Sequence, residues 1–431
     1  MLPIIRYLQA VIDHAPDHMK PDGVPDINAC MQYAISNRLP EAGVMEYLLA
    51  EQSGSLCVLH YSNSVTKEDW NRFDRALRDC RGLVLDLKNS NLPGPLTDAN
   101  IVLRPYSKFF NMDQLPETAE AEILKRLSAA KYVEFAEKMD GSLVCAGFYH
   151  GGIVLATSGR LDIATSPQLR HAARVMGANP QYEKMIKKYP SYTFMFESIA
   201  IDDLHIVDYV KKGVAPGLYL HGARNVADGD IVRYSKIEEI AEYYGIPHVE
   251  VLRGATLTSV LEHNKKSSAR EEEGFVANID GYLLKLKGDD YLQCAVKLQS
   301  LTMNAVIRYI AEGTYDSMTD DFADKPAGIY AKQMADDVRS FMSEMQGAID
   351  DILARYGHIG KTEFFNVVDR EIPKPLLRCV KLAYAGKPYD LLKKGPEGNY
   401  HYTTELEINR MRDAISEYYA SVRQAGQDEK R

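Results

Sequence analysis

The pattern of this chain changes near residue 300, and that change constrains its architecture more than any other feature. Before it, short strand-like runs alternate with helical stretches. Beyond it, long helical patterns dominate, at about 302–312, 327–356, 361–369, 374–384 and 402–424. A chain of 431 residues is also too long for one ordinary hydrophobic core. We therefore expect a mixed domain over residues 1–300, with 1–50 as an N-terminal extension, and a separate helical domain over 301–431.

Short runs in the first part predict strands of largely antiparallel sheets. They alternate apolar and polar residues or form brief apolar stretches between turn residues, at 55–60, 82–87, 132–137, 143–149, 152–157, 193–199, 217–221, 274–279 and 282–286. His150-Gly151-Gly152 and Asp280-Gly281 are typical of tight hairpin turns. Helices are expected at about 117–129, 166–176 and 236–244. The predicted fold class is α+β.

The composition is that of a soluble globular protein and argues against several other classes. Residues are 45% hydrophobic and 26% charged, and no apolar run is long enough to span a membrane. Residues 1–5 are apolar but meet Arg6 at once, so no signal peptide is expected. The six cysteines lie far apart and form no Cys-x-x-Cys pair, which excludes a zinc ribbon and fits reduced thiols in a cytoplasm.

The net charge of −9 argues against a protein that coats nucleic acid indiscriminately. It does not exclude a local basic groove, because the local field decides where a phosphate docks. Residues 371–394 carry such an excess of lysine and arginine, including Lys374, Arg378 and Lys381. This stretch fits a phosphate backbone, and an ordinary solvated helix face is the alternative.

Lys138 is expected at the end of a strand, beside a tight turn. The run before it alternates apolar and charged residues, Asp140-Gly141-Ser142 is typical of a turn, and a second apolar run follows. An amine fixed in this way can lose solvation, lower its pKa and attack phosphorus. The alternative is a solvated β-turn with an exposed lysine, and the motif alone does not decide between the two.

Charged residues in other segments give this lysine a chemical context. Each follows, opens or lies within a strand-like run, and Lys285 and Lys287 share a face because strands have a period of two. Taken singly, the Arg81 and Lys108 segments fit surface charges beside core hydrophobes better, and the lysine pair fits a plain solvent face equally well. Together they form the series expected of a triphosphate site, with a nucleophile, carboxylates for a divalent cation, and cations for the phosphates. In chain order the charged residues are Arg81, Lys108, Lys138, Asp140, Glu197, Glu273, Lys285 and Lys287.

On these motifs the chain resembles the covalent nucleotidyltransferases (polynucleotide ligases and capping enzymes), and within them the phage RNA ligase 1 family. The resemblance covers about residues 75–295 and rests on an ordered series: Cys80-Arg81-Gly82, Lys108-Phe109-Phe110-Asn111, Lys138 through Ser142, Thr193 through Glu197 with Ile206-Val207-Asp208-Tyr209, Glu273-Gly274-Phe275-Val276 and Leu284-Lys285-Leu286-Lys287. The first two segments are features of the RNA ligase 1 branch.

The resemblance implies an ATP-dependent RNA ligase that joins 5′-phosphate and 3′-hydroxyl ends through a covalent lysyl–AMP intermediate, in repair of cleaved tRNA. It implies an antiparallel-sheet nucleotidyltransferase domain, of the ATP-grasp-like ligase type, followed by an all-α C-terminal domain that contacts RNA. ATP would be the substrate and Mg²⁺, or Mn²⁺ in its place, the cofactor. The expected partner is RNA, a tRNA with a broken anticodon loop. We expect a monomer that binds no membrane and lies in the cytoplasm. If a phage encodes the protein, that is the cytoplasm of its host.

The resemblance also implies a role for each matching residue. The catalytic residues would be Lys138, Asp140, Glu197, Glu273, Lys285 and Lys287. ATP would contact Arg81, Lys108, Glu137, Gly141, Ser142, Val207, Tyr209 and Arg160. A metal ion would be held, through water, by Asp140, Glu197 and Glu273. The neighbouring cations Lys285 and Lys287, with that metal, would lower the pKa of Lys138. RNA would contact Lys374, Arg378 and Lys381.

One turn departs from the family's pattern, and two other functions stay open. The family carries a basic residue in a Ser-Lys-Gly-like turn, whereas this chain has Thr157-Ser158-Gly159-Arg160, in which only Arg160 is basic. The alternatives are a DNA ligase or capping-type enzyme, and a non-catalytic RNA-binding protein on a ligase fold. A DNA ligase or capping enzyme would add a strand-rich domain of OB type after the last motif, whereas this chain becomes helical.

Overall fold

The chain folds into two compact units, each with its own hydrophobic core. One unit comprises Met1–Asp203 and Val207–Leu292, and the other Leu204–Ile206 and Gln293–Arg431. This computed structural model describes residues 1–88, 94–200, 205–300, 302–312, 315, 319, 326–371, 377–387, 408, 409, 411–416 and 418. Within those residues, no helix combines the length and the hydrophobicity that crossing a bilayer requires.

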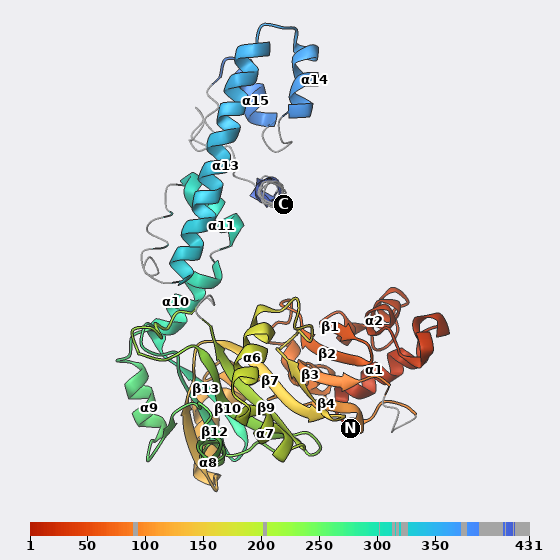
Figure 1. The fold of residues 1–431 in the computed structure, drawn as a ribbon, viewed down its shortest axis with the longest axis vertical. Helices are drawn as coiled ribbons and strands as arrows, with labels where there is room; N and C mark the ends of the chain where they lie inside the picture. The colour runs from red at the N-terminus through yellow and green to blue at the C-terminus, as the bar shows by residue number, and fades with distance from the viewer. Residues whose placement is uncertain are drawn as a thin grey trace. The chain divides into compact units, whose positions relative to one another are not determined.

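The N-terminal part is an antiparallel sheet covered by helices (Figure 1). Its order is β1 (Leu48–Ser53), β2 (Leu56–Tyr61), β3 (Arg81–Asp86) and β4 (Ile101–Leu103). Apolar residues of α1 (Pro3–His14) and α2 (Ile27–Ser36) form one buried cluster with residues of these strands, among them Leu8, Ile27 and Leu85. Residues 1–50, for which the sequence suggests only an extension, therefore help to build the core of this sheet.

A second antiparallel sheet positions Glu197. Its order is β10 (Gly217–Asn225), β9 (Tyr192–Ile199), β7 (Ser142–Tyr149) and β8 (Gly152–Ala156). Phe194 and Phe196 of β9 lie in one buried cluster with residues of α6 (Pro167–Ala178), α7 (Gln181–Lys188) and α8 (Tyr234–Tyr244). Because successive strand residues point to opposite faces, Glu197 faces away from these helices.

A third sheet positions Lys285 and Lys287. Its order is β11 (Val251–Leu252), β6 (Val133–Glu137), β12 (Gly274–Ile279), β13 (Tyr282–Lys287) and β5 (Phe110–Asn111). Leu284 and Leu286 pack with α5 (Glu120–Ala129) and α9 (Leu257–Asn264), so the two lysines lie on the opposite face. The prediction of largely antiparallel sheets is confirmed, with β13 and β5 as a parallel pair.

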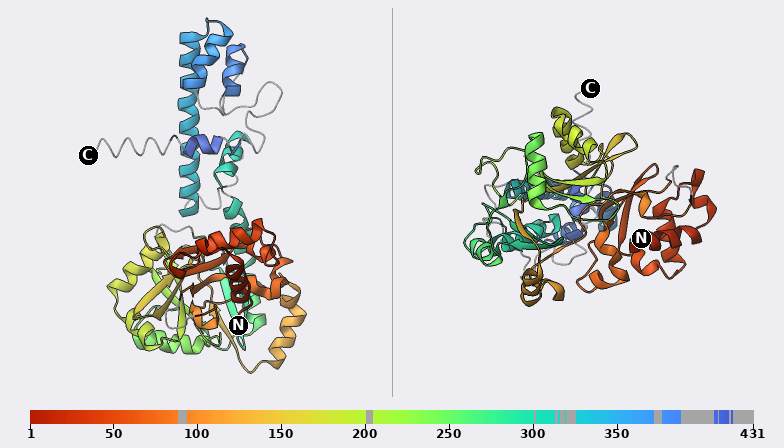
Figure 2. Two further views of the ribbon diagram at one scale, coloured as in Figure 1. Left: turned by 90° about the vertical axis from the view of Figure 1, so that its right-hand side faces the viewer. Right: turned by 90° about the horizontal axis from the view of Figure 1, so that it is seen from below.

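Shorter elements link these helices and strands, and Figure 2 shows the ribbon from two further sides. The α-helical ones are α3 (Ala42–Met45) and α4 (Ala76–Asp79). The 3₁₀ helices are Asp17–Met19, Pro21–Gly23, Asp69–Asn71, Phe73–Arg75, Asp98–Asn100 and Pro116–Thr118.

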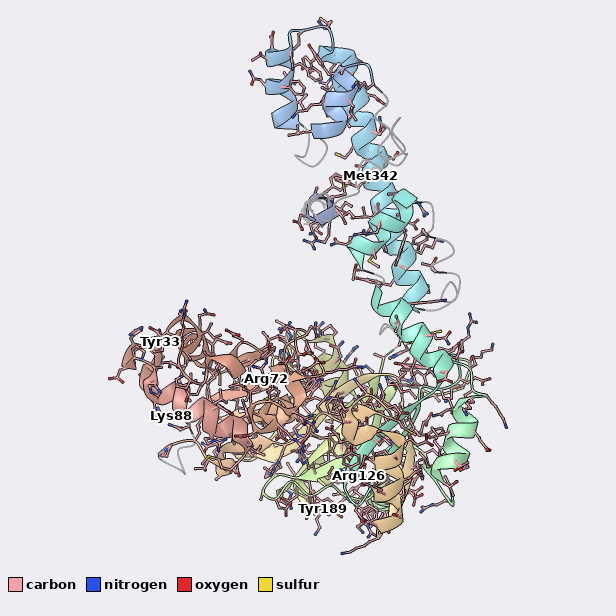
Figure 3. All side chains as sticks on the ribbon, turned by 180° about the vertical axis from the view of Figure 1, so that it is seen from behind. Tyr33, Arg72, Lys88, Arg126, Tyr189 and Met342 are labelled. Carbon is pink, nitrogen blue, oxygen red and sulfur yellow. The ribbon has the colours of Figure 1, made fainter. Side chains whose placement is uncertain are left out.

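The second unit is helical, as predicted. After α10 (Asp289–Ser300) follow α11 (Met303–Glu312), α13 (Pro326–Tyr356), α14 (Lys361–Glu371) and α15 (Leu377–Tyr384). The long α13 carries much of the core, including the buried Met342 that Figure 3 labels. Of the helix predicted over 402–424, the described residues 408, 409, 411–416 and 418 are helical.

Candidate active site

Lys138 leaves the third sheet where β6 ends, and a glycine fixes it there. The Lys138 backbone N–H donates to the Gly274 carbonyl oxygen at 2.8 Å. Gly274 has a φ of +132°, and a Cβ at this position would lie 2.2 Å from the Leu286 carbonyl oxygen. Only glycine fits such a contact at a positive φ. The Lys138 side chain is 20% exposed, so it is not the solvated turn lysine considered as the alternative.

One buried carboxylate bridges two ammonium groups. Glu273 is 3% exposed, its Oε2 lies 2.7 Å from Lys138 Nζ, and its Oε1 lies 2.7 Å from Lys287 Nζ. The pairing of Gly274 with Lys287 across β12 and β13 brings Lys287 beside Glu273. Glu273 thus satisfies two charges that would otherwise be costly to bury.

The carboxylates around Lys138 favour the charged form of its amine. Burial lowers the pKa of Lys138, but attraction to Glu273, Glu197 and Asp140 outweighs burial and raises that pKa above its ordinary value. Glu273 pairs with both Lys138 and Lys287, and the charge of Lys138 in turn lowers the pKa of Lys285.

The lysine with the depressed pKa is Lys285. Burial lowers its pKa well below the ordinary range, and the nearby charges of Arg81, Lys108 and Lys138 act in the same direction. Its Nζ lies 4.8 Å from the centre of the Phe109 ring, and Arg81 lies over the same ring at 6.0 Å. The surroundings of Lys285 are thus an aromatic ring and other positive charges.

Several of these groups line one pocket, whose wall comes from strands of all three sheets together with the start of α8. Six of the predicted residues lie in it: Arg81, Glu137, Lys138, Glu197, Lys285 and Lys287. The rest of the wall is apolar or aromatic apart from His221, and comprises Phe109, Ala136, Met139, Tyr234, Val249 and Val276. A cationic end and an apolar wall suit a nucleotide with its phosphates and base. Sequence reasoning missed His221, Tyr234 and Val249 because no local motif marks them. Met139 lies within the motif of Lys138 but was given no role.

Asp140 holds the turn after Lys138 in place and does not line the pocket. Its Oδ2 accepts the Val207 N–H at 3.1 Å and its Oδ1 accepts the Tyr291 hydroxyl at 2.8 Å. The Asp140 N–H donates to the Tyr209 hydroxyl at 2.6 Å. The predicted residues Asp140, Val207 and Tyr209 therefore do come together, around the loop and beside the pocket. Tyr291, at the start of α10, was not predicted.

Gly141 and Ser142 connect this turn to the second sheet. The Gly141 N–H donates to Glu197 Oε1 at 3.1 Å, and a Cβ on Gly141 would lie 2.6 Å from the Ser198 carbonyl oxygen. Ser142 opens β7, opposite Ser198. Burial raises the pKa of Glu197 to about 7, against the lowering effect of Lys138.

Arg160 lies away from the pocket, which corrects the expectation that it contacts ATP. Its side chain is 65% exposed and pairs with Glu51 at 2.9 Å. Glu51 also accepts the backbone N–H groups of Leu161 and Asp162, so the turn is bound to the first sheet. Lys108 also lies outside the pocket wall, and its Nζ is 3.1 Å from the Tyr61 hydroxyl.

The carboxylates expected to hold a metal are not arranged to ligate it directly. In the described part of the chain, no group of three or more histidine, cysteine, aspartate or glutamate side chains could hold a metal ion. Both oxygens of Glu273 bind lysines, and those of Asp140 bind Val207 and Tyr291. Glu197 lines the pocket, so it fits a contact through metal-bound water.

The residues expected to contact RNA belong to the second unit. Lys381 is exposed on α15. Arg378 lies on the same helix, but its side chain is outside the described part, and Lys374 lies outside the described residues altogether.

Comparison with known proteins gives one family and a set of distant structural matches. A family model described as RNA ligase matches residues 79–294. No curated protein sequence matches significantly. Among solved structures, the chain is similar to an archaeal ATP-dependent RNA ligase, with 14% identity and a TM-score of 0.41 over 78% of this chain and 83% of that one.

A Naegleria gruberi RNA ligase with PPi shares 16% identity at a TM-score of 0.34, over 49% of this chain and 64% of that one. A mutant of the Naegleria gruberi RNA ligase with AMP and Mn also shares 16%, at a TM-score of 0.32 over 40% of this chain and 54% of that one. The chain therefore spans about half the length of this Naegleria gruberi ligase mutant.

Proposed function

This chain belongs to the RNA ligase family, and on that premise we propose that it joins RNA ends by transfer of AMP from ATP through Lys138. The substrates are a 5′-phosphate and a 3′-hydroxyl. The observation that carries the proposal is the pocket in which Lys138 is paired with Glu273 and surrounded by Arg81, Lys285 and Lys287. A triphosphate would neutralise these cations, and its α-phosphorus would lie within reach of the Lys138 amine.

In the first step, Lys138 Nζ attacks the α-phosphorus of ATP. A phosphorus–nitrogen bond forms, the bond from that phosphorus to the bridging oxygen breaks, and pyrophosphate leaves. Lys138 must first lose a proton, and Glu273, 2.7 Å from its Nζ, is the nearest carboxylate that could accept it. Lys285 and Lys287 stabilise the charge that develops on the phosphate oxygens.

In the second step, a phosphate oxygen of the RNA 5′ end attacks the phosphorus of lysyl–AMP, and the Lys138 amine leaves. In the third, the RNA 3′-hydroxyl attacks the activated 5′-phosphate and AMP leaves. Each step exchanges one bond at phosphorus for another, so no further co-reactant is needed.

A divalent metal, Mg²⁺ or Mn²⁺, would neutralise part of the phosphate charge. Glu197 fits it best, through water, because it lines the pocket. Asp140 fits less directly, since its two oxygens hold the turn that carries Lys138.

The proposed biology is the sealing of a tRNA broken in its anticodon loop, by a monomer in the cytoplasm. The second unit would choose the RNA through basic residues on and around α15, including Lys374, Arg378 and Lys381. Support for this is the local excess of lysine and arginine in an otherwise acidic chain.

The test is ligation of a nicked tRNA anticodon stem-loop with defined 5′-phosphate and 3′-hydroxyl ends, in parallel with linear oligonucleotides. We expect sealed product with ATP and a divalent metal, faster on the broken tRNA, and none with Lys138→Ala. Sealing of DNA ends alone would instead identify a DNA ligase, and the absence of any product with the wild-type protein would contradict the proposal.

A further inference from the structure

His221 lines the nucleotide pocket, yet no step of the reaction above uses it. Its side chain is 20% exposed, and its Nε2 is buried without a hydrogen-bond partner among the described residues. This Nε2 lies 3.8 Å from Glu197 Oε2, too far for a hydrogen bond. Because buried polar atoms nearly always have partners, an unpaired one in a pocket wall indicates a group of the ligand.

A β-bulge turns His221 into the pocket. On the pairing of β10 with β9, Leu220 faces Phe196 and Gly222 faces Met195, so His221 is the extra residue between them. Leu220 and Ala223 both lie in the cluster under the helices, which leaves His221 and Gly222 on the opposite, pocket side. Bulges are frequent beside active sites because they redirect a side chain in this way.

A glycine beside the bulge makes room for the ring that supports His221. A Cβ on Gly222 would lie 2.1 Å from the Tyr106 hydroxyl oxygen, so Tyr106 packs where a side chain would otherwise be. The ring centroids of Tyr106 and His221 are 6.1 Å apart. The Tyr106 ring therefore packs beside the imidazole.

The ring is uncharged, and its buried nitrogen in the pocket wall is Nε2. Burial, Arg81 and Lys138 lower the pKa of His221 to about 3, while a hydrogen bond to its own backbone acts in the opposite direction. A neutral imidazole keeps a lone pair on one of its nitrogens, and we assign that lone pair to Nε2, which has no partner among the described residues.

Two acceptors therefore stand side by side in the wall, Nε2 of His221 and Oε2 of Glu197, 3.8 Å apart. A nucleotide offers two hydroxyl donors on neighbouring carbons only in its ribose. Its phosphates carry no donor at neutral pH and suit the cations Arg81, Lys285 and Lys287 instead.

We propose that His221 is a specificity-determining residue that accepts a hydrogen bond from a ribose hydroxyl of the bound nucleotide, beside Glu197. The inference rests on the proposed function and deepens it, because it assigns a sugar-recognition role to a residue outside every motif. The same pocket should then discriminate against nucleotides that lack one of the two hydroxyls.

The test compares ATP, 2′-deoxy-ATP and 3′-deoxy-ATP, each labelled at the α-phosphate, in the covalent labelling of the protein. His221→Phe keeps the ring and its contact with Tyr106 but removes the acceptor. His171→Phe is the matched control, because His171 on α6 also has a buried Nε2 without a partner in the described part and lies outside the pocket. His221→Leu serves as a second variant, and thermal melting establishes that each protein is folded.

We expect the wild-type protein and His171→Phe to prefer ATP over at least one deoxy analogue by roughly tenfold in kcat/KM. In His221→Phe this preference should fall to about threefold or less, because ATP is slowed and the analogue is not. An equal loss for all three nucleotides, an unchanged preference, or no preference in the wild-type protein would each overturn the proposal. If the wild-type protein takes no label from ATP, the proposed function fails, and calorimetric binding of the same nucleotides decides the role of His221 separately.

Discussion

At the scale of single residues, the pKa values of the lysines in the site depend on which charged groups lie next to each of them. Four basic and three acidic side chains lie in or beside the pocket, and their proximity shifts pKa values in opposite directions. Glu273 and the other carboxylates raise the pKa of Lys138, whereas burial and the neighbouring cations lower the pKa of Lys285. Binding of phosphate would raise the pKa of Lys285, whereas attack requires Lys138 to lose a proton.

Binding of ATP should be accompanied by proton uptake at Lys285. Burial holds the pKa of this amine well below its usual range, and nearby phosphate oxygens raise that pKa, so the amine takes up protons from the buffer as ATP binds. In Lys138→Ala, which cannot react, titration calorimetry in buffers of different ionisation enthalpy should show this uptake. Adding Lys285→Met should abolish it, and adding Lys184→Met, on the exposed face of α7, should not. The same uptake with and without Lys285 would refute this assignment.

Glu197→Gln should stabilise the protein in alkaline solution. The folded pKa of Glu197, about 7, lies above its unfolded value, so ionisation opposes folding. This destabilisation of the wild-type fold is absent below about pH 4.5 and grows as the pH rises to about 7. At higher pH it reaches its full size of about 3 kcal/mol. Urea unfolding at pH 5 and pH 8 measures this. A variant equally stable or less stable than the wild-type protein at pH 8 would be inconsistent with the buried carboxyl.

At the scale of elements, the third sheet sets the distance between nucleophile and phosphate clamp. Gly274 begins β12, accepts the Lys138 N–H, and pairs with Lys287 of β13. The start of β12 therefore positions both lysines that pair with Glu273, Lys138 and Lys287.

Gly274→Ala should disrupt this junction. The new Cβ would lie 2.2 Å from the Leu286 carbonyl oxygen at a φ of +132°. Backbone strain and overpacking together should therefore lower the free energy of unfolding by about 3 kcal/mol or more. Gly177→Ala is the control, because Gly177 lies in α6 with nothing within 4 Å of the new Cβ. It should be neutral or raise the free energy of unfolding by about 0.5–1 kcal/mol. Similar unfolding free energies for both variants would contradict the account of Gly274.

Much of the sheet structure could be predicted from the sequence because it is local. The periods of β6, β7, β9, β12 and β13 are visible in the order of apolar residues, and so are the faces of Glu197, Lys285 and Lys287. Other features depend on pairing across the fold. The bulge at His221 exists only in the register of β10 on β9. The protonation of Lys138 depends on Glu273, which is distant in sequence, and motif spacing cannot give that balance.

At the scale of the whole molecule, the two units divide the proposed work. The first holds the pocket and the motifs, and the second is a helical body whose core includes α11, α13, α14 and α15. If the second unit selects RNA, changes on its surface should leave the covalent labelling with AMP intact.

Lys381→Glu on α15 is therefore expected to weaken binding of a broken tRNA stem-loop by roughly tenfold and to leave the first step unchanged. The matched control is Lys332→Glu, which reverses a charge at an exposed position of α13. Filter binding at two salt concentrations and labelling with ATP measure the two properties. Equal tRNA affinity in both variants and the wild-type protein would argue against this surface of α15 as an RNA contact.

The most direct measurement of the central claim is the site at which the protein retains AMP. After incubation with α-labelled ATP and a divalent metal, followed by denaturation and proteolysis, mass spectrometry should find one AMP on the Lys138 amine and none in Lys138→Ala. Adduct on another residue, adduct that persists in Lys138→Ala, or no adduct at all would contradict the account.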